Sequence, residues 1–146
     1  MNENALMQLN FTVLVVDDDD VAIEGIVRSL RKSRIDCHIV SASDGLEALE
    51  ILNRQHETKN LKRHFIILLD LEMPRMDGFT FLEHIRRDPS LTSAVVFVLT
   101  TSSRDADRAR AYNDHIAGYM VKSAVGPQFS KLVEFLKQIE GTIFLP

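Results

Sequence analysis

Five residues with chemically active side chains each follow a short apolar segment of this 146-residue sequence. They are three acids, a threonine and a lysine: Asp17, Asp18, Asp70, Thr100 and Lys122. Carboxylates held close together either bind a cation or have raised pKa values. Each residue alone has a structural explanation, since an acid after a strand is often a helix cap and threonine suits a strand. Five such residues in one pattern favour a shared site.

The combination of residue types indicates a hard-cation site that handles phosphate. Oxygen ligands suit Mg²⁺, which keeps several waters and bridges to phosphate oxygens. A carboxylate beside Mg²⁺ and an ammonium group can act as a nucleophile toward phosphorus. The cation and the lysine would neutralise charge on the phosphoryl oxygens. Zinc is not favoured, because the five histidines are scattered and the single cysteine, Cys37, has no evident partner ligand.

Short apolar segments alternate with longer amphipathic ones, which predicts five strand–helix units. The expected strands are 11–16, 37–42, 64–70, 94–100 and 116–122. The expected helices are 21–34, 43–55, 79–87, 103–115 and 126–140, the last with Pro127 at its start. The expected caps of the first two helices are Asp19 or Asp20 and Ser43 or Asp44. This alternation predicts an α/β fold, a doubly wound parallel sheet that binds ligands at the carboxyl ends of its strands.

Composition indicates one globular domain. The chain is 45% hydrophobic and 26% charged, and its length suits a single core. We expect an N-terminal extension at 1–10, a domain at 11–140 and a tail at 141–146. The net charge of −4 argues against a nucleic-acid partner. No signal peptide or membrane span is evident, and one cysteine fits a reducing, cytoplasmic setting.

Four motifs together resemble those of two-component response regulator receiver domains, over roughly residues 11–140. They are VLVVDDDD (13–20), ILLDLEMPRMDG (67–78), VFVLTTS (96–102) and GYMVKS (118–123). The second motif, D-L-x-M-P-x-M-D-G, is highly specific, and the full set in this order is stronger still. The resemblance implies a flavodoxin-like (βα)5 fold, with a five-stranded parallel sheet in the strand order 2-1-3-4-5.

The resemblance also implies a phosphoacceptor and a metal site. Asp70 would accept the phosphoryl group, and Lys122 would pair with that group once it is transferred. Asp18 and Asp70 would bind Mg²⁺, and Asp17 would assist through a water molecule. The backbone carbonyl of Glu72 would be a further ligand of the metal.

A switch is the third implication of the resemblance. Thr100 would hydrogen-bond to the phosphoryl group, and Tyr119 would change its rotamer in response. Glu72 and Ser102, two residues beyond Asp70 and Thr100, would set the rate of dephosphorylation. The chain departs from the family at Ser123, where many receivers have a proline after a cis peptide bond. A cis bond before serine costs about 3 kcal/mol, so the Lys122–Ser123 peptide is expected to be trans or strained.

The expected partners are proteins. The resemblance implies a sensor histidine kinase or a histidine phosphotransfer protein. The segment TTSSRDADRARAYNDHIAGYMVKS (100–123) and the ending FLP (144–146) are similar to those of phytochrome-associated single-domain regulators, so a phytochrome-type kinase is a candidate. No output domain is expected after the last helix, which leaves contact with a downstream protein target or a homodimer. The apolar tail at 141–146 would pack on the domain or extend a dimer contact. No nucleic-acid or membrane partner is expected.

Two alternatives compete with this interpretation. A phosphatase resembling the haloacid dehalogenase superfamily would use Asp17 and Asp19, but it also needs an acidic pair on a late strand. After Lys122 the only acids are Glu134 and Glu140, both in the last expected helix. The other alternative is a receiver-like interaction module that works without phosphate, and the intact set of acids, threonine and lysine argues against it.

Overall fold

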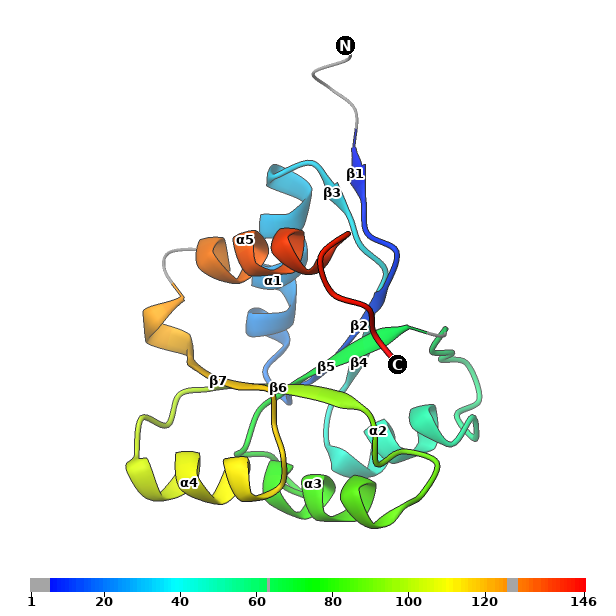
Figure 1. The fold of residues 1–146 in the computed structure, drawn as a ribbon, viewed down its shortest axis with the longest axis vertical. Helices are drawn as coiled ribbons and strands as arrows, with labels where there is room; N and C mark the ends of the chain where they lie inside the picture. Colours follow the sequence, from blue (N-terminus) through cyan, green and yellow to red (C-terminus); the bar gives the residue numbers. More distant parts are fainter. Residues whose placement is uncertain (1–5, 63, 126–128) are drawn as a thin grey trace.

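A five-stranded parallel sheet forms the centre of the computed structural model, which describes residues 6–62, 64–125 and 129–146 (Figure 1). In spatial order its strands are β4 (Ile39–Ala42), β2 (Thr12–Val16), β5 (Phe65–Leu69), β6 (Val95–Thr100) and β7 (Gly118–Val121). All four neighbouring pairs are parallel. Numbered along the chain, these five strands have the order 2-1-3-4-5, so the predicted sheet is confirmed.

Helices cover both faces of the sheet. They are α1 (Asp20–Lys32), α2 (Gly45–Leu52), α3 (Gly78–Arg87), α4 (Asp105–Asn113) and α5 (Ser130–Ile139). In Figure 1, α1 and α5 lie on one side of the sheet, and α2, α3 and α4 lie on the other. The expected start of the last helix, at Pro127, lies outside the described residues.

Alternation along β2 explains how one strand serves both faces. Its five residues are all buried. Leu14 and Val16 belong to the hydrophobic cluster beneath α2 and α3, whereas Val13 and Val15 belong to the cluster beneath α1 and α5. Successive side chains of a strand point to opposite faces, so a continuous apolar run is what a strand buried on both sides requires.

Aspartates begin three of the helices, and the expected caps are resolved by hydrogen bonds. Asp19, not Asp20, caps α1 by accepting from the amide of Val21. Asp44, not Ser43, caps α2 by accepting from the amide of Glu47. Such caps satisfy amide groups that the first turn of a helix leaves without partners.

Three small elements, two strands and a short helix, were not predicted. β1 (Met7–Gln8) pairs in parallel with β3 (Ile35–Asp36), and the short helix η1 (Lys122–Ala124) follows β7. The segment expected as an N-terminal extension therefore contains a short paired strand at its end. Segments of two or three residues carry no periodicity, which is why sequence patterns did not find them. The domain boundaries themselves stay predictions.

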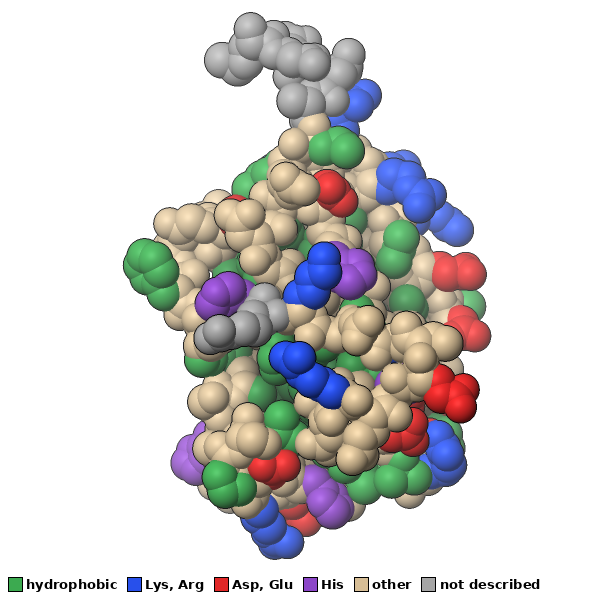
Figure 2. Space-filling view, turned by 90° about the vertical axis from the view of Figure 1, so that its right-hand side faces the viewer, with side chains coloured by type: hydrophobic (Ala, Val, Ile, Leu, Met, Phe, Trp, Pro, Cys, Tyr) green, Lys and Arg blue, Asp and Glu red, His purple; other side chains and the backbone are tan. Residues whose placement is uncertain are grey.

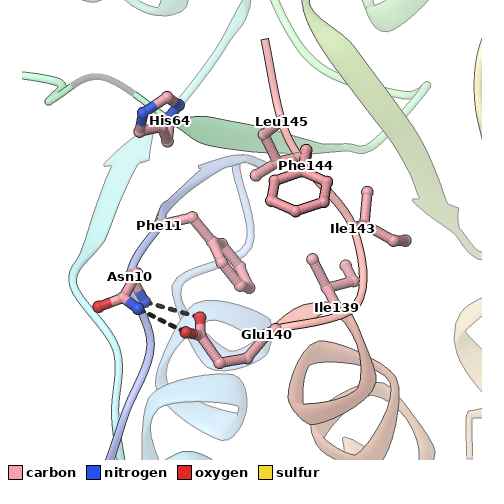
Figure 3. Close-up of a pocket in the computed structure, with 9 residues that line it drawn as sticks. Asn10, Phe11, His64, Ile139, Glu140, Ile143, Phe144 and Leu145 are labelled. Carbon is pink, nitrogen blue, oxygen red and sulfur yellow. Dashed lines mark hydrogen bonds between the residues drawn. The ribbon is translucent and has the colours of Figure 1, made fainter.

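The C-terminal tail lies at the amino ends of the strands. It borders a pocket of about 250 Å³, together with Phe11 and His64, which directly precede β2 and β5 (Figure 3). Glu140 accepts hydrogen bonds from the backbone and side-chain nitrogens of Asn10, at 2.8 and 2.6 Å. Leu145 packs against the cluster beneath α1 and α5, as expected for a tail that packs on the domain.

The surface carries mixed charge. Figure 2 shows one face of the molecule, on which acidic and basic side chains are interspersed with apolar ones. In the part of the chain that the structure describes, the large hydrophobic side chains that stay exposed are Leu6, Val21, Leu46, Tyr112, Ile143 and Phe144. Among the described residues, no helix is long and apolar enough to cross a membrane.

Candidate functional site

Three carboxylates meet at the carboxyl edge of the sheet. Asp17 and Asp18 follow β2, and Asp70 follows β5, the neighbouring strand. One carboxylate oxygen of each residue lies within 4.8 Å of those of the other two. Asp17 and Asp70 are buried, whereas Asp18 is exposed. Adjacent parallel strands thus bring together acids that are more than fifty positions apart in the sequence.

Lys122 places a positively charged side chain beside two of these acids. Its Nζ lies 2.7 Å from Oδ2 of Asp17 and 3.5 Å from Oδ2 of Asp70. Burial alone would lower the pKa of Lys122, but the ion pairs with both acids raise it above its ordinary value. Burial raises the pKa of Asp17 above its ordinary value, although Lys122 and the amide of Asp19 oppose this change. The ammonium group is therefore held firmly in its charged form between two acids.

The peptide bond after Lys122 is trans, since the described residues contain no cis peptide bonds. Lys122 is the first residue of η1, which follows β7 directly. Its ammonium group reaches the acids across the ends of β6 and β5, from the far edge strand of the sheet. Ser123 in place of proline therefore leaves the ion pair intact, and the trans alternative of the sequence prediction is confirmed.

The ligand chemistry at this edge fits a divalent cation. Three carboxylates against one ammonium group leave an excess of negative charge if all are ionised. Oxygen donors of this kind are preferred by hard cations that keep part of their water shell. Asp18 is exposed, which leaves a path from solvent to the acids. Asp17, Asp18 and Asp70 could together hold such an ion.

The loop after Asp70 doubles back closely on itself. The amide of Gly78 donates to the carbonyl of Leu71, at 3.0 Å. A Cβ atom at Gly78 would lie 2.4 Å from the carbonyl oxygen of Asp70, so only glycine fits there. Glu72 lies on this loop with its side chain exposed, and its amide is 3.5 Å from Oδ1 of Asp70. Gly78 of the motif thus lets the backbone close around the acid.

An ion pair that the sequence analysis missed ties this loop to α2. Arg75 contacts Oδ2 of Asp44 through both Nε and Nη2, each at 2.5 Å. Asp44 is buried and also caps α2. Arg75 has a φ of 61°, in the left-handed region, so the loop turns sharply at this residue. The pair joins residues 31 positions apart, and no periodic pattern connects them.

Thr100 and Tyr119 are linked through Ser102. Thr100 ends β6 and is fully buried, and its Oγ1 accepts from the amide of Ser102 at 3.4 Å. The hydroxyl of Tyr119, on β7, donates to the carbonyl of Ser102 at 2.9 Å. Leu69 pairs with Val98, so Asp70 and Thr100 leave the ends of adjacent strands. The structure brings the predicted switch residues together at the same edge as the acids.

The sequence of this chain is similar to those of known regulatory proteins. Over 129 residues the chain is 34% identical to response regulator Rcp1 of Synechocystis sp., covering 88% of this chain and 84% of that protein. It is also 34% identical over 128 residues to the probable methanogenesis regulatory protein FilR2 of Methanothrix harundinacea, covering 88% and 82% of the two chains.

Solved structures extend the similarity. The crystal structure of the Mn²⁺-bound form of Rcp1 has a TM-score of 0.79 at 33% identity, covering 93% of this chain and 99% of that one. The phosphorylated cyanobacterial phytochrome response regulator RcpA has a TM-score of 0.80 at 32% identity, covering 97% and 99%. The family model of the response regulator receiver domain matches residues 13–134. The chain therefore belongs to the response regulator receiver domain family, as a receiver of a two-component system.

Proposed function

We propose that Asp70 accepts a phosphoryl group, in an Mg²⁺-dependent step, from a sensor histidine kinase or a histidine phosphotransfer protein. One observation carries the proposal: the carboxylate of Asp70 lies at the carboxyl edge of the sheet beside two further acids and the ammonium group of Lys122. The family match supports phosphorylation on an aspartate but does not itself identify the residue.

The chemistry follows from these positions. An Oδ atom of Asp70 attacks phosphorus, the P–N bond of phosphohistidine breaks, and the imidazole leaves with the bonding electrons. Lys122 pairs with the phosphoryl oxygens and offsets their charge. Asp18, Asp17 through water, and the carbonyl of Glu72 would hold Mg²⁺, which supplies further charge neutralisation when bound.

The switch is a change of population between two arrangements of β6 and β7 and the loops that follow them. The phosphoryl group supplies a new hydrogen-bond acceptor for the hydroxyl of Thr100. Thr100 is connected to Tyr119 through Ser102, so a movement of Thr100 acts on the tyrosine as well. The phosphoryl group provides the difference in contact energy that such a shift requires.

We propose that the protein works as a signalling switch, assisting only its own phosphorylation and dephosphorylation. Its relative RcpA is named as a phytochrome response regulator, which makes a phytochrome-type kinase a candidate partner for this chain. Output would pass to a downstream protein, with a homodimer as one form of the active state. A cytoplasmic location remains a prediction.

Incubation with acetyl phosphate and Mg²⁺ tests the proposal. Intact-mass measurement should show one added phosphoryl group on the wild type and none when the metal is chelated. Asp70→Asn should abolish the adduct, because the amide is not a nucleophile toward phosphorus. Asp20→Asn, an exposed acid in the same sequence run that lies outside the cluster, should leave the adduct intact. An adduct that survives Asp70→Asn would refute the assignment.

A further inference from the structure

Ser102 has every polar group engaged in the structure. Its amide donates to Oγ1 of Thr100, and its carbonyl accepts from Tyr119. Its hydroxyl donates to Oδ2 of Asp107 at 2.7 Å and accepts from the amide of Arg104 at 3.3 Å. A serine hydroxyl has one hydrogen to donate. That hydrogen is committed to Asp107, a residue of α4, and is not available to groups near Asp70.

Asp107 is itself held in place. Its two carboxylate oxygens accept from Nε and Nη2 of Arg104, at 3.1 and 3.3 Å. The residue is 9% exposed and lies in the first turn of α4, where the helix dipole favours an acid. The hydrogen bond from Ser102 lowers the pKa of Asp107 below its ordinary value despite the cost of desolvation. The acceptor for the serine hydroxyl is therefore ionised at neutral pH and fixed by a second partner.

We propose that Asp107 is a positioning residue that holds the hydroxyl of Ser102 away from the phosphoryl group on Asp70 and so prolongs the life of that group. This inference rests on the proposed function. Hydrolysis requires water to attack phosphorus while the bond between phosphorus and the Asp70 oxygen breaks. The products are inorganic phosphate and the free carboxylate, and the proton of the water passes to phosphate or solvent. A hydroxyl that orients this water would speed the step.

The arrangement also connects α4 with the switch. Asp107 belongs to α4, whereas Ser102 is bonded to both Thr100 and Tyr119. A partner that displaces Asp107, or that binds Arg104 in its place, would release the serine hydroxyl. The lifetime of the phosphoryl group would then depend on what is bound at the start of α4.

The test compares the lifetime of the phosphoryl group between variants. Each variant is first phosphorylated with acetyl phosphate and Mg²⁺, free acetyl phosphate is then removed, and the decay of the adduct is followed. Asp107→Ala should shorten the half-life roughly two- to ten-fold, the range expected from one hydrogen bond. Asp105→Ala is the matched control, because Asp105 is an acid in the same turn that pairs with Arg108 and does not contact Ser102. This control should keep the wild-type half-life.

A double variant separates positioning from general destabilisation. If Asp107 acts through the serine hydroxyl, Asp107→Ala should have no effect on the half-life once Ser102→Ala has removed that hydroxyl. Asp107→Leu, which also lacks an acceptor but fills the space, should behave as Asp107→Ala does and replaces it if the alanine variant unfolds.

Three results would overturn the inference. They are an unchanged half-life in Asp107→Ala, an equal change in Asp105→Ala, and an equal change in the Ser102→Ala background. In each case a wild-type adduct on Asp70 would leave the proposed function standing. A wild type that never gains a phosphoryl group would overturn the proposed function, and with it this inference.

Discussion

Lys122 and Asp17 each shift the pKa of the other, and both lie beside the carboxylate of Asp70. Asp17 is 4% exposed, so its carboxylate loses most of its contact with water. A buried carboxylate without a cation would be costly. Lys122 supplies that cation at 2.7 Å and stays charged because the acids raise its pKa. The lysine thus places a positive charge beside the buried carboxylate of Asp17 before any phosphoryl group arrives.

Lys122→Ala should slow phosphorylation of Asp70 by roughly ten-fold or more, the effect of losing one charged hydrogen bond to the phosphoryl oxygens. Binding of Mg²⁺ should persist, because all three carboxylates remain. Asp17 would also no longer be paired with an ammonium group. Rates of adduct formation and calorimetric titration with Mg²⁺ measure the two properties separately. Lys131→Ala, an exposed lysine at the start of α5, is the control. A wild-type phosphorylation rate in Lys122→Ala would contradict the role given to this lysine.

At the residue scale the sequence predicted the positions that strands determine and missed those that loops determine. Asp17 and Asp70 follow apolar strands, Thr100 ends one, and parallel strands place their carboxyl ends at one edge. The contact of Arg75 with Asp44 depends instead on a left-handed turn. No hydrophobic period records such a turn, so only the three-dimensional structure could show this contact.

At the element scale α2 is joined to the loop that follows it. Glu47 accepts hydrogen bonds from the amide and hydroxyl of Ser43, which precedes the helix. Its other carboxylate oxygen lies 3.0 Å from Nε2 of His56 and 3.4 Å from Nζ of Lys59. Nδ1 of His56 accepts from two backbone amides, so Nε2 carries the proton and donates to Glu47. The sequence predicted the start of this helix from its cap, but not these partners.

Glu47 should make stability depend on pH in the acid range. Partial burial opposes ionisation, but the bonds from Ser43, His56 and Lys59 outweigh it and lower the pKa of Glu47 from 4.5 to about 2. The unfolded chain, in which Glu47 has its ordinary pKa, therefore binds a proton at this carboxylate more tightly than the folded chain does. The stabilisation is therefore fully present above pH 4.5 and is lost as the pH falls toward about 2.

Urea unfolding of wild type and Glu47→Gln at a series of pH values measures this contribution. Allowing for screening by solvent, the variant should be less stable by about 2 kcal/mol at pH 7. The difference should shrink across the acid window and vanish at its lower end. Glu50→Gln, an exposed acid on the same helix, should show no such trend. A difference between wild type and Glu47→Gln that stays constant with pH would mean that ionisation of Glu47 does not contribute.

At the scale of the whole molecule, the three acids of the proposed metal site follow strands whose residues form the two hydrophobic clusters, but the acids themselves belong to neither cluster. The clusters lie on opposite faces of the sheet, whereas the acids stand at its carboxyl edge, after β2 and β5. The tail and its pocket lie at the amino ends of the strands. Charge repulsion at the carboxyl edge opposes folding, because folding is what brings the three acids within 4.8 Å of one another.

Mg²⁺ should therefore stabilise the fold, since it binds the assembled acids and has little affinity for the unfolded chain. At about one hundred times the dissociation constant the gain is about 2.7 kcal/mol, or roughly 5–10 °C in Tm for a domain of this size. Asp18→Asn should abolish most of the gain while leaving the ion pair of Lys122 with Asp17 in place. Asp20→Asn, outside the cluster, should keep it. An equal rise in Tm in Asp18→Asn would place the stabilising ion elsewhere on the protein.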